Sequence, residues 1–140
     1  MSLLIKSLSE LKQSIVLMES RPDFCIFAEE AGSLNNTSYE WSFGNGDDSQ
    51  MGFGIVLPYN CSLLAITLST RQGEAIVEAR KNNSSTNLEV ISNDSNRNAV
   101  SIASQAINFE AGDVLGFRTV SALDASHGGK ITAWFKWREN

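Results

Sequence analysis

The stretch KITAWFKW, residues 130–137, decides the fold class of this chain. Its apolar and polar residues alternate, which is the two-residue period of a β-strand with one face turned to a hydrophobic core. Trp134 falls on the nominally polar face. It belongs either to ordinary core around a central strand or to a contact between sandwiches in an oligomer. The predicted core-facing residues are Ile131, Ala133, Phe135 and Trp137.

Similar short segments recur throughout the chain after Pro22, and no helical period is left there. Turn-rich pieces such as GNGDDSQ, RQG, NNSSTN and SALDASHGG separate them. About ten short strands at this spacing predict an all-β sandwich. The segments are DFCIFAE, SYEWSF, MGFGIVLP, SLLAITLS, EAIVEARK, NLEVIS, AVSIAS, AINFE, DVLGFRTV and KITAWFKW.

Residues 1–20 follow a different rule. Their large apolar residues are spaced alternately by four and three positions, as in the seam of a heptad repeat, and Pro22 then ends the helix. A helix this short is marginal in water, so it needs a partner. One solution is a surface helix lying on its own domain. We expect instead the end of a parallel coiled-coil stalk, residues 1–20, that carries a β-sandwich head, residues 21–140. The seam residues, which do not separate a dimer from a trimer, are Leu4, Leu8, Leu11, Ile15 and Met18.

Composition excludes several classes of partner. The formal net charge is -5 and no basic run occurs, so a phosphate backbone is not an expected partner. No apolar stretch approaches the roughly 20 residues of a membrane span, so we expect no stable membrane insertion. Cys25 and Cys61 are isolated in the sequence. They are expected to be small buried hydrophobes, with a disulfide between them left open.

Candidate reactive residues are few. His127 lies in the polar loop DASHGG with no second His or Cys nearby, which argues against a metal site or a catalytic triad. Asp47 and Asp48 lie side by side in GNGDDSQ, a composition typical of a turn. The sequence therefore predicts no catalytic residue, no metal and no cofactor. A rigid sandwich with polar loops suits the presentation of a recognition surface.

Loop positions can be estimated if every predicted strand reverses the chain. The base of the head is then the end that carries the stalk. This count places loops 31–38, 58–61, 82–87 and 121–129 at the distal end. It places 44–50, 71–73, 93–98 and 110–112 at the base.

Four stretches together resemble the C-terminal head domains of bacteriophage tail-needle and tail-fibre proteins: SYEWSFGNG, GIVLPYNCSLLAITLS, NFEAGDVLGFRTV and ITAWFKW. The likeness spans roughly residues 23–140, and its most specific element is FEAGDVLGFRT. Those heads are similar to the tumour-necrosis-factor-like and complement-collagen-head jelly rolls, which assemble as trimers above a stalk. The resemblance implies a jelly-roll fold, a homotrimer and a place at the virion tail tip, in a protein made in the host cytoplasm. The family has no catalytic residues to carry over.

We therefore expect a non-enzymatic, homotrimeric head that contacts the bacterial envelope during attachment or genome delivery, with a glycan as one candidate receptor. A carbohydrate-binding module of a bacterial surface protein or enzyme is the alternative, and a polysaccharide depolymerase tip is a third. The predicted distal contact residues are Asn35, Asn36, Thr37, Tyr39, Asn82, Asn83, Ser84, Asp124, Ser126 and His127. The predicted trimer-interface residues are Trp41, Trp134 and Trp137.

Overall fold

The structure is a computed structural model that describes residues 21–34, 39–41, 49–50 and 54–139. Every strand pairing in this part of the chain is antiparallel, and the all-β prediction is confirmed. The predicted stalk and its seam, Leu4 to Met18, lie outside the described residues and stay a prediction. The strands are β1 (Phe24–Ser33), β2 (Tyr39–Glu40), β3 (Ser49–Gln50), β4 (Ile55–Val56), β5 (Cys61–Lys81), β6 (Ser84–Ser92), β7 (Asn98–Phe109) and β8 (Val114–Trp137).

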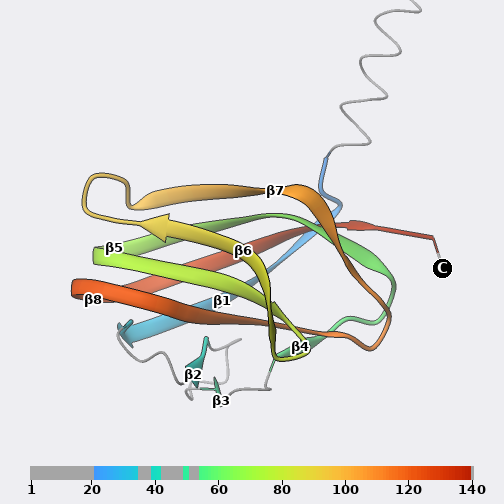
Figure 1. Ribbon diagram of the computed structural model, residues 1–140, viewed down its shortest axis with the longest axis horizontal. Coiled ribbons are helices and arrows are strands. Elements are labelled where there is room, and N and C mark those ends of the chain that lie inside the picture. The colour runs from blue at the N-terminus through green and yellow to red at the C-terminus, as the bar shows by residue number, and fades with distance from the viewer. Residues whose placement is uncertain (1–20, 35–38, 42–48, 51–53, 140) are drawn as a thin grey trace, which may run out of the picture.

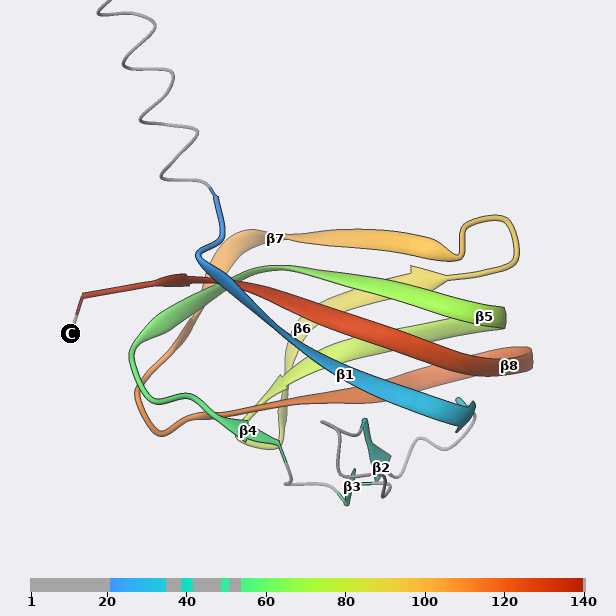
Figure 2. The ribbon, with the colours of Figure 1, turned by 180° about the vertical axis from the view of Figure 1, so that it is seen from behind.

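Two long strands form the frame of the fold. β5 and β8 pair with each other from Cys61 opposite Trp137 to Lys81 opposite Leu115. Both bend sharply at one end of the molecule, where they appear at the left in Figure 1 and at the right in Figure 2. Gly73 and Gly128 lie at these bends with φ of 76° and 62°, a conformation that glycine adopts without steric cost. The paired strands therefore fold over and contribute to two layers.

The first layer contains, in order, β1, residues 127–137 of β8, residues 61–72 of β5, and β7. The second contains the short strands β2 and β4, the first part of β8, the second part of β5, and β6. Side chains of both layers fill the space between them, and each large apolar side chain buried there contributes about 1.5–3 kcal/mol. The largest fully buried ones include Trp41, Phe109, Phe117 and Phe135.

The molecule has two distinct ends. At one, Arg138 N donates a hydrogen bond to Asn60 O (3.0 Å) and Trp137 N donates one to Asp23 Oδ2 (2.8 Å). We call this the entry end, because β1 starts there and β8 finishes there. The opposite end, where β5 and β8 bend and Ser33 pairs with His127, is called the far end.

Among the described residues there are eight strands where about ten were predicted. SLLAITLS and EAIVEARK are the two halves of β5, and DVLGFRTV and KITAWFKW are the two halves of β8. AVSIAS and AINFE are likewise one strand, β7. A turn-like sequence between two segments can bend a strand without ending its hydrogen-bonded ladder.

This difference corrects the predicted loop positions. β2 and β4 both run antiparallel to the first part of β8, β2 opposite Arg118 and β4 opposite Leu115 and Val114, whereas they were counted as two strands of opposite direction. Consequently loops 58–61 and 82–87 are not distal, and 71–73 and 93–98 are not at the base. The prediction also counted β7 as two strands, and this second miscount reverses the effect of the first one. Loop 110–112 therefore lies at the entry end, as predicted. The end of β1 and the bend of β8 do lie at the far end, also as predicted.

Candidate binding surface at the far end

An open cleft of about 410 Å³ lies at the far end. It forms where the end of β1 meets the bends of β5 and β8, three segments that are distant in the sequence. Its lining brings together two acidic and two basic residues, with backbone of the β8 bend between them. The charged residues are Glu29, Glu30, Arg71 and Lys130.

Two glycines shape the floor of this cleft. Gly128 allows the bend of β8, and the Arg71 side chain packs beside it. At Gly129 a Cβ atom would lie 2.6 Å from Cη2 of Trp41, so only glycine leaves room for the indole below. Trp41 Nε1 donates a hydrogen bond to Thr119 Oγ1 at 3.0 Å, which fixes the ring in place. The HGG sequence at 127–129 therefore serves packing and backbone geometry.

The charges on the rim of the cleft are only loosely held. Lys130 Nζ lies 3.1 Å from Glu29 Oε1, and both side chains are more than half exposed. The same ammonium lies 5.0 Å from the centre of the Phe27 ring. Exposed ion pairs of this kind contribute about 0–1 kcal/mol, so their replacement by contacts with a bound molecule costs little. The cleft can accept a polar ligand with both donors and acceptors.

One predicted contact residue, His127, lies next to this cleft but is not part of its lining. His127 is half-buried in the bend of β8, opposite Ser33 and Gln72 and adjacent to Gly128. Asp124 and Ser126 belong to the same strand, and Tyr39 belongs to β2, but their side chains are not among those described. Asn35, Asn36 and Thr37 lie outside the described residues. A contact role for these residues stays a prediction.

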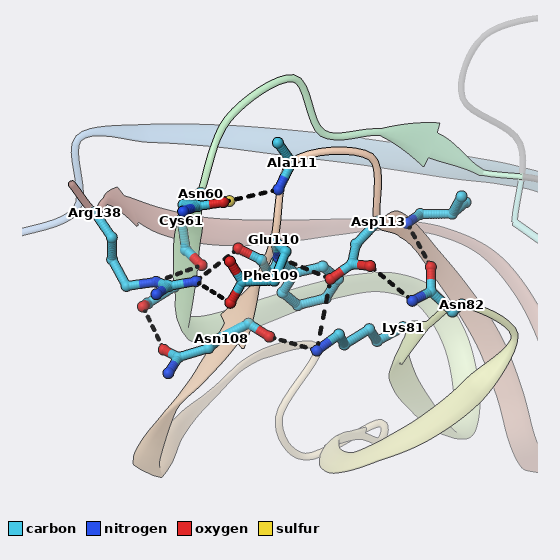
Figure 3. Close-up of polar contacts among 12 residues, drawn as sticks. Asn60, Cys61, Lys81, Asn82, Asn108, Phe109, Glu110, Ala111, Asp113 and Arg138 are labelled. Carbon is cyan, nitrogen blue, oxygen red and sulfur yellow. Dashed lines mark hydrogen bonds and ion pairs between the residues drawn. The ribbon is translucent and has the colours of Figure 1, made fainter. Parts of the chain in front are cut away.

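Three other predicted contact residues, Asn82, Asn83 and Ser84, lie toward the entry end. Asn82 Nδ2 donates a hydrogen bond to Asp113 Oδ1 (2.8 Å), and its Oδ1 accepts one from Val114 N (2.9 Å). Asn82 and Asn83 have φ of 51° and 63°, as expected of Asn in a tight turn. The Asn82 side chain holds the β5–β6 turn to the β7–β8 turn (Figure 3). All three residues lie at this turn, so the distal grouping predicted for them is corrected.

The C-terminal Arg138 completes the closure of the entry end (Figure 3). Its guanidinium donates hydrogen bonds to Cys61 O (3.2 Å) and Phe109 O (2.8 Å), and it pairs with Glu110 Oε1 (3.0 Å). Asp113 Oδ2 accepts a hydrogen bond from Glu110 N at 2.7 Å, which closes the FEAGD turn. These contacts give the FEAGD motif a structural role, because they hold the turn between β7 and β8 in place.

Electrostatics at this end follow from the same contacts. The hydrogen bond from Asn82, followed by that from Glu110 N and the nearby Lys81, lowers the pKa of Asp113. Burial raises the pKa of the Cys61 thiol to about 11, partly opposed by Arg138. Cys25 is exposed and Cys61 buried, and both are free, so the open question of a disulfide between them is answered in the negative.

The three predicted interface tryptophans have different surroundings. Trp41 is 2% exposed and packs inside its own chain, which corrects its assignment to a subunit interface. Trp134 is half-buried on the outer face of the first layer, with its Nε1 3.2 Å from Thr67 Oγ1. Trp137 was also predicted to face the core, yet it is 43% exposed and stacks on Phe24 at 4.2 Å. It lies at the entry end, where β8 finishes and the core no longer covers both sides.

Sequence reasoning missed the charged residues of the cleft. Arg71 lies in RQG, which the count of predicted strands places at the base. Lys130 is the first residue of the predicted strand KITAWFKW. Glu29 is the last residue of the first predicted strand, DFCIFAE, and Glu30 follows it directly. Charge next to a turn was the one signal in the sequence, and it could not show that three separate turns meet.

Within the described residues, no group of three or more His, Cys, Asp or Glu side chains is placed to hold a metal ion. No helix in that part of the chain is long and apolar enough to cross a membrane.

The fold and the surface define a class: an antiparallel β-protein whose sheet curls into two layers, with an open polar cleft at one end. No protein-family model and no curated protein matches the sequence. Among solved structures, the chain is similar to one in the acidic stable capsid structure of the Helicobacter pylori bacteriophage KHP30. The TM-score is 0.48 at 12% identity, over 81% of this chain and 88% of that chain. That neighbour is part of a phage capsid.

Proposed function

We propose that this chain is a non-enzymatic, homotrimeric head at a phage tail tip, and that its far end contacts the bacterial envelope. The observation that carries the proposal is the placement of the two ends of the head. Asp23, which directly precedes β1, and Arg138 lie together at the entry end. An attached stalk would leave from there, so the far end with its cleft points away from the attachment. The resemblance of the sequence to phage tail-tip heads supports the same assignment.

The chemistry of the cleft narrows the partner. Glu29 and Glu30 balance Arg71 and Lys130, so the cleft has no net positive charge for a polyanion. A neutral or zwitterionic glycan of the envelope fits better, because its hydroxyl groups can both donate hydrogen bonds to carboxylates and accept them from guanidinium and ammonium groups. The open shape of the cleft allows part of a longer chain to bind.

The test is binding of the labelled full chain to envelope fragments of its host bacterium. The double variant Arg71→Ala/Lys130→Ala should bind at least about a hundredfold more weakly, since it removes two charge-assisted hydrogen bonds that contribute about 1.5–3 kcal/mol each. Arg21→Ala, which removes an exposed cation at the entry end, is the matched control and should bind like the parent chain. Equal binding by all three proteins, with unchanged circular dichroism, would refute contact through the cleft.

A carbohydrate-binding module remains the second candidate, and one observation favours it. Tyr59 is 59% exposed, and its ring meets the exposed Trp137 edge-on at 5.9 Å. Exposed aromatic rings are the usual platform for sugars. This candidate predicts a monomer whose sugar affinity, measured by calorimetry, is lost in Tyr59→Ala and kept in Arg71→Ala/Lys130→Ala.

A further inference from the structure

The outer face of the first layer is unusually apolar. Two rows of side chains cross its four strands. One row is Cys25, Trp134, Ala65 and Ile102, and the other is Phe27, Thr132, Thr67 and Val100. We call these two rows the outer apolar face. Ile102 is 76% exposed, Val100 66% and Phe27 54%.

This face is not part of the core of the chain. The same strands already bury Leu63, Ile66 and Leu68 on their opposite side, between the layers. Four strands at a spacing of ~4.8 Å, crossed by two rows, give a patch on the order of 300 Å². Contiguous apolar patches of this size on a folded domain commonly mark interaction sites.

The polar groups of the face are compatible with its burial. The indole N–H of Trp134 already donates a hydrogen bond to Thr67 Oγ1, so burial of the ring leaves no donor without an acceptor. Neither row contains a charged side chain. The adjoining row toward the far end carries Glu29 and Lys130 as a neutralised pair, and the one toward the entry end carries Lys136. In a chain of net charge -5, this is a region where two copies can meet without repulsion between carboxylates.

We propose that the outer apolar face is covered by neighbouring copies of this chain. The inference rests on the homotrimer of the proposed function and names its interface. The interface residues, in place of the predicted Trp41, are Ile102, Val100, Phe27 and Trp134. Residues 1–20, which lie outside the described structure, end just before Arg21, four residues from Cys25. Copies joined side by side through the heptad seam would bring these adjacent faces together.

Because the patch is small, the contact between heads depends on the contact between the N-terminal segments, residues 1–20. A stable interface buries about 800 Å² on each partner, more than this patch provides. Association through residues 1–20 would hold the heads at a high effective concentration, so a weak head contact becomes populated. In this proposal the outer apolar face and residues 1–20 form the interface between copies together.

The test is the mass of the full chain in solution, measured by sedimentation equilibrium over a range of concentrations. The variant Ile102→Glu is compared with Ile91→Glu, which puts the same charge on β6 in the second layer, where Ile91 is 50% exposed. We expect three chains for the parent and for Ile91→Glu, and at least a tenfold higher concentration for half-dissociation of Ile102→Glu. Val100→Glu should behave like Ile102→Glu. Melting curves of the variants check that each one folds.

The outcomes separate the inference from the function on which it rests. Three chains in Ile102→Glu and Val100→Glu, with the stability of Ile91→Glu, would overturn the inference and leave the trimer standing. A monomeric parent chain would overturn both, while binding through the cleft is decided by its own experiment. If deletion of residues 1–20 from a monomeric chain speeds thiol labelling of Cys25, the face is covered by the N-terminal segment of its own chain.

Discussion

Trp41 and Gly129 show how one residue pair connects the core to the candidate surface. The indole fills the space that a side chain at 129 would need, and the cleft lies directly above. The surface of the cleft at Gly129 is therefore tied to the packing of the core below it.

Gly129→Ala tests this contact. The added Cβ forces the indole to shift, and we expect the free energy of unfolding to fall by about 1–3 kcal/mol, as for other overpacked cores. Urea denaturation measures the change. In the background of Trp41→Phe, which lacks the clashing Cη2 atom, the same substitution should cost less. Equal costs in both backgrounds would contradict the proposed clash.

The two cysteines should differ strongly in reactivity. Burial raises the pKa of Cys61 to about 11, so at pH 8 only about one thiol in a thousand is a thiolate. Cys25 is exposed in the single chain. In the Ile102→Glu variant we expect one fast-labelling thiol, lost in Cys25→Ser, and a second that reacts only after unfolding. In the parent chain, labelling of Cys25 should slow as concentration rises. Labelling that is independent of concentration would contradict burial of the outer apolar face.

At the scale of elements, the turns at the entry end hold the two layers together. Asp113 joins the β7–β8 turn to the β5–β6 turn through Asn82, and it closes its own turn through Glu110 N. Because a single carboxylate serves both turns, its ionisation is linked to the stability of the whole sandwich.

Asp113→Ala should lower the free energy of unfolding at pH 7 by about 1–3 kcal/mol, through the hydrogen bonds lost. The hydrogen bond from Asn82 lowers the pKa of Asp113 in the folded state below its ordinary value. Its contribution is therefore fully present above the unfolded pKa of about 3.9 and is lost as the pH falls through the lower folded value. Chemical denaturation at a series of pH values should show less loss of stability in acid for the variant than for the parent. Glu89→Ala, an exposed change on β6, is the control; an equal acid dependence in both variants would refute the role of Asp113.

The elements also show where sequence reasoning was limited. Alternation correctly placed Ile131, Ala133 and Phe135 in the core, because the period of a strand is local. It could not show that the segments on either side of RQG are one strand. A bend and a chain reversal use the same turn residues, and only the partner strand decides between them.

At the scale of the whole molecule, the entry end and the cleft lie at opposite ends of the head, which is where the proposed function puts attachment and recognition. The outer apolar face lies on the first layer between these ends, and its row nearer the entry end contains Cys25, the second residue of β1. In the proposed trimer the heads would contact each other along this side, and their far ends would remain exposed together. Three copies of the cleft would then act on one surface, which raises the avidity of a weak contact.

Deletion of residues 1–20 should weaken self-association by at least tenfold, because it removes the linked contact while the outer apolar face is unchanged. Sedimentation equilibrium of the shortened chain measures the effect, and circular dichroism checks that the head still folds. Association as strong as in the full chain would contradict the dependence of the head contact on the N-terminal segment.

The sequence by itself determined the fold class, because the alternation of a strand is a local period. The heptad segment over residues 1–20 follows from a local period too and stays a prediction. The charge of the sequence excluded a phosphate backbone as an expected partner. Only the tertiary structure decided that Trp41 lies in the core and that Asn82 connects two turns. It also decided that Glu29, Arg71 and Lys130 share one cleft. It also decided that Phe27, Val100 and Ile102 form one surface. These facts depend on which strand lies beside which, and strand pairing joins residues too distant in the chain for any local pattern to record.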